Sequence, residues 1–233
     1  MPVVPAFSPS RDTLPLSRGA LPATLDTKVD VPYLPPVAVD QTRMGLSPGL
    51  VLLARALHET GRPAAGLTDA GAIPLALANR LVEGTRACLA APGAAERWLG
   101  ATAALDHDTW FWGPGLYAET VTAAHAVMAR VDAGELCAVG VVLAQSPLAG
   151  AVFDNQVVLA YGYDLVGTRL TLRVYDPGVT GPASDRDAVT ITLELGSSAP
   201  AKPIRTNGTC CADRPGRIRG FFVLPLPDLT RQL

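Results

Sequence analysis

Residues 154–164 read Asp-Asn-Gln-Val-Val-Leu-Ala-Tyr-Gly-Tyr-Asp, and residues 172–177 read Leu-Arg-Val-Tyr-Asp-Pro. Both stretches are rich in valine, leucine and tyrosine, which favour β-strands. A short segment with a glycine, Leu165-Val166-Gly167, separates the two strands and is typical of a hairpin turn. Because proline cannot donate a hydrogen bond within a sheet, Pro177 ends the second strand. The sequence therefore predicts two paired strands, 156–164 and 168–176.

Three further strands are expected around this hairpin. Residues 137–144 form a continuous apolar run of strand length. Residues 188–195 alternate between apolar and polar side chains, as expected for a strand with one buried face. Residues 219–224 give a last strand. The second half of the chain is thus predicted to be mostly antiparallel sheet.

The first half has helical patterns after residue 44. Ser47-Pro48 is a favourable start for a helix, and Gly61 with Pro63 is a favourable end. Further helices are expected over 74–89, with Pro74 at a tolerated first position, and over 117–131, followed by Gly134. Helices first and antiparallel strands afterwards predict an α+β fold.

The chain divides by composition into three parts. Residues 1–44 hold many prolines and no helical period, so we expect an extended arm over the body, with an edge strand near 29–33. Residues 45–135 form a helical subdomain, and residues 136–233 form the antiparallel sheet subdomain. We expect these parts to make one unit, because a chain of 233 residues can bury one sizeable core.

The overall composition excludes several classes of protein. A net charge of −2 and a charged fraction of 17% provide no basic surface for nucleic acid. No apolar run is long enough for a membrane helix, and the first residues do not read as a signal peptide. The four cysteines have no metal-ligand spacing, so we expect reduced thiols in a cytoplasmic protein.

The hairpin with its Tyr-Asp-Pro end resembles the papain-like cysteine peptidase fold, in particular bacterial relatives similar to bacteriocin leader peptidases. The resemblance extends over most of the chain after about residue 40. It implies a papain-like unit in which N-terminal helices pack on a C-terminal antiparallel sheet. In that family a cysteine nucleophile begins a central helix, a histidine base lies on a strand, and an Asp or Asn on the next strand orients the histidine.

The resemblance assigns four candidate positions. Ser47, in the segment Gly-Leu-Ser-Pro-Gly-Leu, stands at the nucleophile position, and Gln41 stands where the family has its oxyanion glutamine. Gln156 stands at the histidine position, and Asp176 matches the orienting acid. A serine needs a strong positioned base, and a glutamine cannot accept a proton at neutral pH. The substitutions therefore predict a protein that is not a peptidase.

Each of these residues also has an ordinary structural explanation. Ser47 with Pro48 makes a good helix N-cap, Gln156 can bond Asp176 or the backbone, and Asp176 can cap the turn before Pro177. The three histidines do not have the spacing of a relay with Ser47. We expect no metal and no cofactor: His107 between Asp106 and Asp108 is a weak ligand set, and no phosphate-binding loop occurs.

Aromatic residues gather at Trp110 and Trp112, and tyrosines occur on the predicted hairpin at Tyr161, Tyr163 and Tyr175. These side chains either pack between parts of the chain or line a pocket for an apolar ligand.

Three functions follow as hypotheses. The first is a cleft that binds or folds a small apolar metabolite, such as a cyclase of bacterial natural-product biosynthesis that works by positioning its substrate. The second is a hydrolase or acyltransferase that uses Ser47. The third is a non-catalytic interaction domain. The sequence does not fix the oligomeric state.

Overall fold

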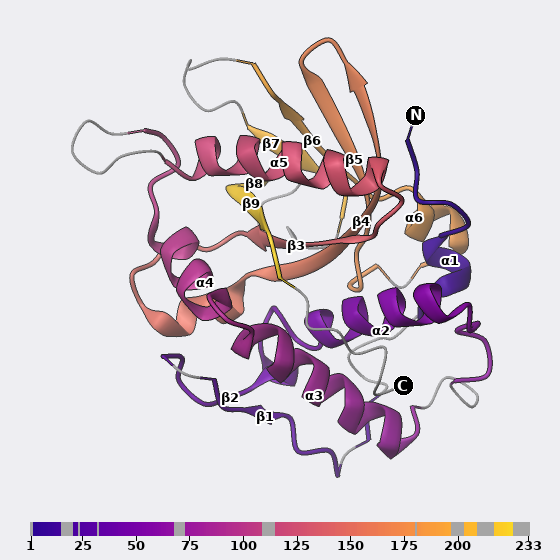
Figure 1. The fold of residues 1–233 in the computed structure, drawn as a ribbon. Coiled ribbons are helices and arrows are strands. Elements are labelled where there is room, and N and C mark those ends of the chain that lie inside the picture. The colour runs from indigo at the N-terminus through magenta and orange to yellow at the C-terminus, as the bar shows by residue number, and fades with distance from the viewer. Residues whose placement is uncertain are drawn as a thin grey trace.

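The computed structural model describes residues 2–14, 21–22, 24–31, 33–67, 73–108, 115–179, 181–196, 203–208 and 217–225. Figure 1 shows a mixed arrangement in which helices lie around a curled sheet. The sheet has seven strands, and every neighbouring pair is antiparallel. The predicted α+β class is confirmed.

The seven strands follow the order β8-β7-β6-β5-β4-β3-β9. Their bounds are β3 Cys137–Val142, β4 Gln156–Val166, β5 Arg169–Tyr175, β6 Thr190–Glu194, β7 Ile204–Thr206, β8 Arg217–Ile218 and β9 Gly220–Val223. The two outermost strands, β8 and β9, are separated in the chain only by Arg219. The sheet therefore curls until both of its ends meet on one extended segment.

The β4–β5 hairpin forms the middle of this sheet, as the opening stretch of sequence predicts. Its turn is Gly167-Thr168, slightly later than expected, because Leu165 and Val166 still pair with Leu170 and Arg169. Gly167 has φ 60°, the left-handed conformation that two-residue hairpin turns use. The register shifts between Ala160 and Gly162, which marks a bulge in β4.

The larger helices are α2 Ser47–Thr60, α3 Leu75–Ala90, α4 Ala94–Ala103 and α5 Leu116–Asp132. Helix α2 is buried at every residue from Ser47 to Ala54, so it is a core helix. It ends at Gly61, whose φ of 65° is the left-handed cap expected from the sequence. A Cβ on Gly49 would lie 2.1 Å from the Leu81 carbonyl oxygen, so α2 and α3 cross this closely only because residue 49 is a glycine.

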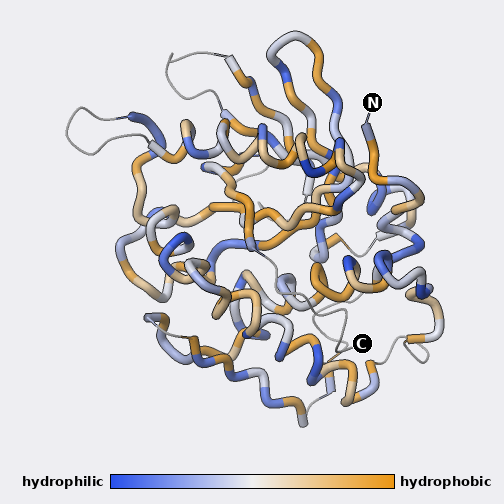
Figure 2. Tube along the Cα trace, in the orientation of Figure 1, coloured by the Kyte–Doolittle hydropathy of each residue, from blue (hydrophilic) through white to orange (hydrophobic). Residues whose placement is uncertain are grey.

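Helix α5 lies against β9 and β4, above β3 in the view of Figure 1, and α2 and α3 lie below β3. Figure 2 shows hydrophobic residues along the interior strands. Trp98 of α4 fills the core beside Phe222, with 4.7 Å between the ring centroids. Among the described residues, no helix is long and apolar enough to cross a membrane.

The N-terminal part of the chain is irregular but anchored. It contains a short helix α1 Pro9–Asp12, a two-stranded ribbon of β1 Lys28–Val29 and β2 Val37–Ala38, and a 3-10 turn η2 Val39–Gln41. Its apolar side chains belong to the main core; these are Val4, Phe7, Leu14, Val29, Val31, Leu34 and Val39. A second 3-10 segment, η3 Ala149–Asp154, leads into β4, and α6 Ala183–Asp187 follows β5.

Candidate functional site

Ser47 is the first residue of α2 and faces the start of β4. Its hydroxyl donates to the Met44 carbonyl oxygen (2.7 Å) and accepts from the Val157 amide (3.3 Å). The N-cap position is occupied by Leu46, so Ser47 does not have the N-cap role that the sequence suggests. It instead joins the central helix to the strand that carries Gln156.

Gln156 opens β4 and reaches the end of β5. Its side-chain nitrogen Nε2 donates a hydrogen bond to Oδ1 of Asp176, the residue that follows β5. The Gly178 amide donates to the same oxygen at 2.8 Å. A Cβ on Gly208 would lie 2.5 Å from Oδ2 of Asp176, so the backbone at Gly208 packs directly against this carboxyl.

Ser47 therefore reaches the start of β4 through the backbone amide of Val157, next to Gln156, while Gln156 and Asp176 form a direct side-chain pair. The exposed fractions of Ser47, Gln156 and Asp176 are 6%, 5% and 2%, so all three residues are closed to solvent. We call these three residues the Ser-Gln-Asp network.

Gln41 is separate from this network. It ends η2 and is exposed to solvent. The segment between Gln41 and Ser47 is fixed by the Met44 amide, which donates to the Phe153 carbonyl oxygen at 2.9 Å. This bond ties the approach to α2 to the approach to β4.

Two residues that the sequence did not single out hold the start of β4. Asn155 Oδ1 accepts from the amides of Leu143 (2.8 Å) and Ala144 (3.0 Å), and its Nδ2 donates to Thr102 Oγ1 at 2.9 Å. Arg219, at the junction of β8 and β9, forms an ion pair of 2.7 Å with Asp106. Its guanidinium also donates to three backbone carbonyls, those of Thr102, Ala104 and Ala144.

The only sequence signal for these two residues is a polar side chain directly before a predicted strand (Asn155) or at its first position (Arg219). Asn155 directly precedes Gln156, and Arg219 directly precedes β9. Together they fix the loop after β3 and the end of α4, and so they position Gln156.

The three tyrosines point to three different places. The Tyr161 hydroxyl donates to the Asp187 carbonyl oxygen at 3.0 Å, while the Tyr163 hydroxyl lies 2.9 Å from Oδ1 of Asp132 on α5. Burial raises the pKa of both phenols. Tyr175 is buried in the interior, and burial raises its pKa as well. The tyrosines are therefore not grouped around the Ser-Gln-Asp network; Trp110 and Trp112 lie outside the described residues.

This arrangement is unsuited to acyl transfer. Among the described residues, the Ser47 hydroxyl has no base as a hydrogen-bond partner, because its proton is directed at a backbone carbonyl. The Gln156 amide nitrogen donates and cannot remove a proton. An activated nucleophile needs a base within hydrogen-bond reach.

The described cysteines do not supply an activated nucleophile in place of Ser47. Cys88 and Cys137 are free and buried, and burial raises the pKa of Cys137 to about 11 and also raises the pKa of Cys88. Both are therefore thiols at neutral pH. Within the described ranges, no group of His, Cys, Asp and Glu side chains is arranged to hold a metal ion. Cys210 and Cys211 lie outside those ranges.

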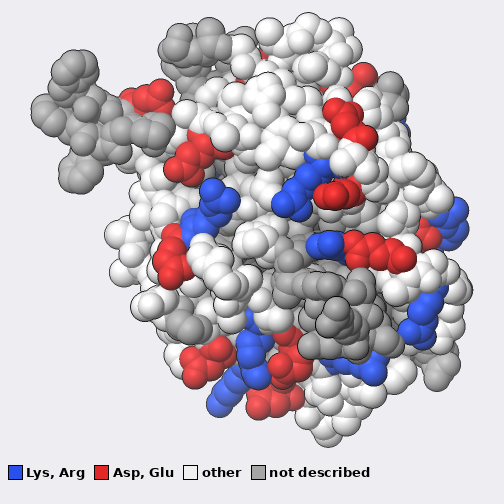
Figure 3. Space-filling view, viewed as in Figure 1, with Lys and Arg blue, Asp and Glu red and all other residues white. Residues whose placement is uncertain are grey.

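Charges on the surface are mixed. On the face shown in Figure 3, Lys and Arg side chains alternate with Asp and Glu side chains, without a field of one sign. This face offers no extended basic surface to a polyanion.

Comparison with protein-family models, curated proteins and solved structures returned no match for this chain. The resemblance to papain-like proteins therefore stays a prediction from the sequence.

Proposed function

We propose that this chain is a papain-like protein that has no peptidase activity and that binds a small apolar molecule. One observation carries the proposal. Gln156 at the start of β4 bonds Asp176 at the end of β5, and Ser47 at the start of α2 bonds the backbone amide of Val157, the neighbour of Gln156. These are the places where the resemblance puts a nucleophile, a base and an orienting acid.

The network supports a loss of covalent chemistry. Ser47 and Gln156 both use their donors on fixed acceptors, Met44 O and Asp176 Oδ1. A catalytic pair would instead pass a proton from one to the other. The three side chains now stabilise the junction of helix and sheet, which is a structural use of the former site.

The side chains around the network are apolar. Met44 and Leu46 before Ser47 are buried, and so are Val157 and Val158 after Gln156. A site with apolar walls and a few fixed polar groups suits small hydrophobic molecules. If the protein is an enzyme, the reaction class that fits is a cyclisation promoted by holding two ends of one substrate together, since this needs no nucleophile.

A binding titration tests the ligand class. N-phenyl-1-naphthylamine, a neutral apolar fluorophore, should bind with saturable one-to-one stoichiometry. If the ligand binds beside the network, binding should also shift the amide resonance of Val157, which bonds Ser47 Oγ. A non-saturable signal, or binding that leaves the Val157 amide unchanged, would count against the proposal.

A probe for activated serines tests the missing chemistry. A fluorophosphonate should leave Ser47 unlabelled in the folded protein, as read by mass spectrometry of the peptide. Labelling of Ser47 at a rate similar to that of a serine hydrolase would overturn the claim that the base is absent.

A non-catalytic interaction domain is a second candidate, favoured by Tyr33. This residue is 74% exposed and has φ 69°, a conformation that non-glycine residues rarely adopt. The Leu34 amide closes the turn onto the Val31 carbonyl oxygen at 3.0 Å and holds the ring outward. A partner of this surface should bind the purified protein and lose affinity at least about tenfold on Tyr33→Gly, since exposed aromatics are frequent hot spots. Equal affinities would remove this candidate.

A further inference from the structure

The first residues of the chain are attached to the bulged part of β4. We call residues 2–14 the N-terminal strap. The Val4 amide donates to the Tyr161 carbonyl oxygen at 2.7 Å, and the Tyr163 amide donates to the Pro2 carbonyl oxygen at 3.1 Å. Strand β3 pairs with β4 only up to Ala160. The strap therefore takes the place of β3 beside the rest of β4.

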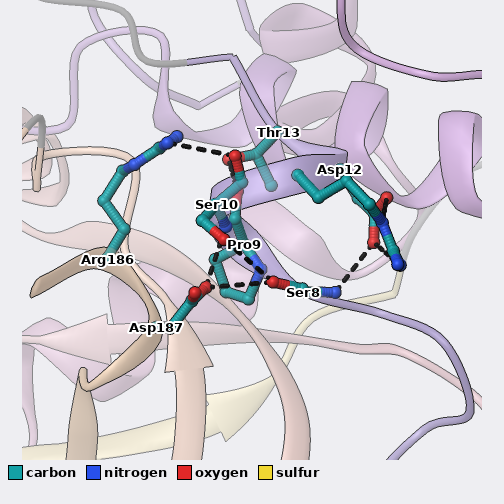
Figure 4. A network of polar contacts seen from close by, with 8 residues as sticks. Ser8, Pro9, Ser10, Asp12, Thr13, Arg186 and Asp187 are labelled. Carbon is teal, nitrogen blue, oxygen red and sulfur yellow. Dashed lines mark hydrogen bonds and ion pairs between the residues drawn. The ribbon is translucent and has the colours of Figure 1, made fainter. Parts of the chain in front are cut away.

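Side chains add a second set of anchors, shown in Figure 4. Asp187 Oδ1 accepts from the Ser8 hydroxyl (3.3 Å) and the Ser10 amide (2.8 Å). Arg186 donates from Nη2 to the Ser10 carbonyl oxygen at 3.0 Å. The anchors all come from α6.

Phe7 supplies the apolar anchor of the strap. Its ring lies 5.5 Å from His58 of α2 and 5.4 Å from Tyr161, centroid to centroid. The strap is thus held by β4, α6 and α2 together.

The corner beneath the strap contains polar atoms without partners. Among the described residues, the Tyr175 hydroxyl and the Nε and Nη1 atoms of Arg186 are buried and have no hydrogen-bond partner. Tyr175 is near Thr13, whose hydroxyl donates its one proton to the Pro9 carbonyl oxygen at 2.6 Å; no hydrogen bond joins the two hydroxyls. Buried donors without partners destabilise the state that buries them.

The strap also holds a strained residue. Ala6 has φ 62° in the turn that the Phe7 amide closes onto the Val4 carbonyl oxygen. A side chain in this conformation is unfavourable relative to glycine. Docking of the strap is therefore opposed by backbone strain at Ala6 and by the buried donors beneath the strap that have no hydrogen-bond partner.

From these opposing contributions, we propose that the N-terminal strap is a releasable latch, which lifts from β4, α6 and α2 as one unit while the sheet stays folded. Release hydrates Tyr175 and Arg186 and frees Ala6 to relax. The latch depends on no ligand and no reaction, so it stands apart from the proposed function.

Native-state hydrogen exchange tests the release. The amides of Val4 and Tyr163 should exchange through a common opening that is at least about a hundredfold more frequent than the opening of Val139, because local opening costs less than global unfolding. Val139 lies in β3 with strands on both sides. Equal opening constants at the three amides would overturn the proposal.

A matched pair of conservative variants tests the cause. Tyr175→Phe removes a hydroxyl without a partner, so the opening constant of the Val4 amide should fall about tenfold. Tyr161→Phe removes a hydroxyl that bonds the Asp187 carbonyl oxygen, so the same constant should rise about tenfold. If both variants raise the opening constant, the unpaired polar atoms beneath the strap do not drive its release, and the proposal fails.

Discussion

Two buried polar clusters meet at adjacent residues, Tyr175 and Asp176, and they differ in how well their atoms are paired. Asp176 belongs to the Ser-Gln-Asp network, where the described donors of Ser47 and Gln156 reach acceptors. Tyr175 belongs to the corner beneath the N-terminal strap, where its hydroxyl and two nitrogens of Arg186 have no partner among the described residues.

This difference separates a rigid region from a labile one. A fully paired buried network resists opening, because each broken bond leaves an unpaired group in an apolar environment. A cluster with unpaired donors gains hydrogen bonds to water when it opens. The same interior therefore contains a fixed junction between helix and sheet and, one residue away, a corner that favours local opening.

The largest effect is expected for Asp176→Ala. This change leaves the Gln156 amide and the Gly178 N–H without their acceptor, and the free energy of unfolding should fall by about 3 kcal/mol. Urea denaturation measures it. Asp176→Asn keeps an acceptor oxygen, so its free energy of unfolding should fall by less. A fall of under about 1 kcal/mol for the alanine variant would show that the network does not stabilise the fold.

The next largest effect is expected for Asn155→Ala, because Asn155 positions Gln156. The amides of Leu143 and Ala144 lose their acceptor, and stability should fall by about 2 kcal/mol. Asn207→Ala is the matched control, since its amide also bonds the backbone, at Thr190 and Ala188, but is exposed. Water can replace those bonds, so the control should lose less than about 1 kcal/mol. Equal losses would contradict the distinction between buried and exposed bridges.

A smaller effect of opposite sign is expected for Ala6→Gly in the strap. Glycine adopts φ 62° without strain, so strap docking should strengthen by about 1 kcal/mol and exchange of the Val4 amide should slow. Tyr33→Gly removes the same strain outside the strap. This variant should raise global stability without slowing exchange of the Val4 amide. If it slowed that exchange as much as Ala6→Gly does, the strain at Ala6 would have no specific effect on docking of the strap.

The smallest effect is expected from acid. Burial alone would raise the pKa of Asp12, but hydrogen bonds from Arg11 and from the Ser8 amide outweigh it and hold the pKa below its ordinary value. The stabilisation is present above the ordinary pKa and is lost as pH falls through the lowered one. The turn from Ser8 to Asp12 should therefore fray at acid pH, and exchange of the Ser8 amide should rise by less than about tenfold, as expected for a pair whose arginine is exposed. Asp12→Asn should abolish this pH dependence.

Much of the fold follows from periodicity in the sequence. The hairpin of β4 and β5 and the helices α2, α3 and α5 have clear apolar patterns and recognisable ends such as Gly61. Helix α4 was not predicted, although Ala94, Trp98 and Ala101 are buried at helical spacing. Strands β7 and β8 are three and two residues long. Strands this short contain too few alternations of apolar and polar side chains to be predicted from the sequence.

The candidate site was less predictable, because its contacts join distant parts of the chain. The sequence suggests an N-cap role for Ser47, whereas the hydroxyl bonds Val157, 110 residues away. A pairing of Gln156 with Asp176 was one of the alternatives that the residues allowed, and the structure contains it. The unpaired Tyr175 hydroxyl had no sequence signal, since a missing partner depends on packing of the strap against α6.

We propose that the chain keeps a papain-like scaffold whose chemistry has been lost, and restoring that chemistry tests the proposal most directly. The double variant Ser47→Cys with Gln156→His places a thiol at the start of α2 and an imidazole beside Asp176. Thiolate absorbance, measured against the parent protein during a pH titration, should show the new thiol ionising about 2 pH units lower than in Ser47→Cys alone. The same ionisation in both variants would contradict the account, because the imidazole would then not face the thiol.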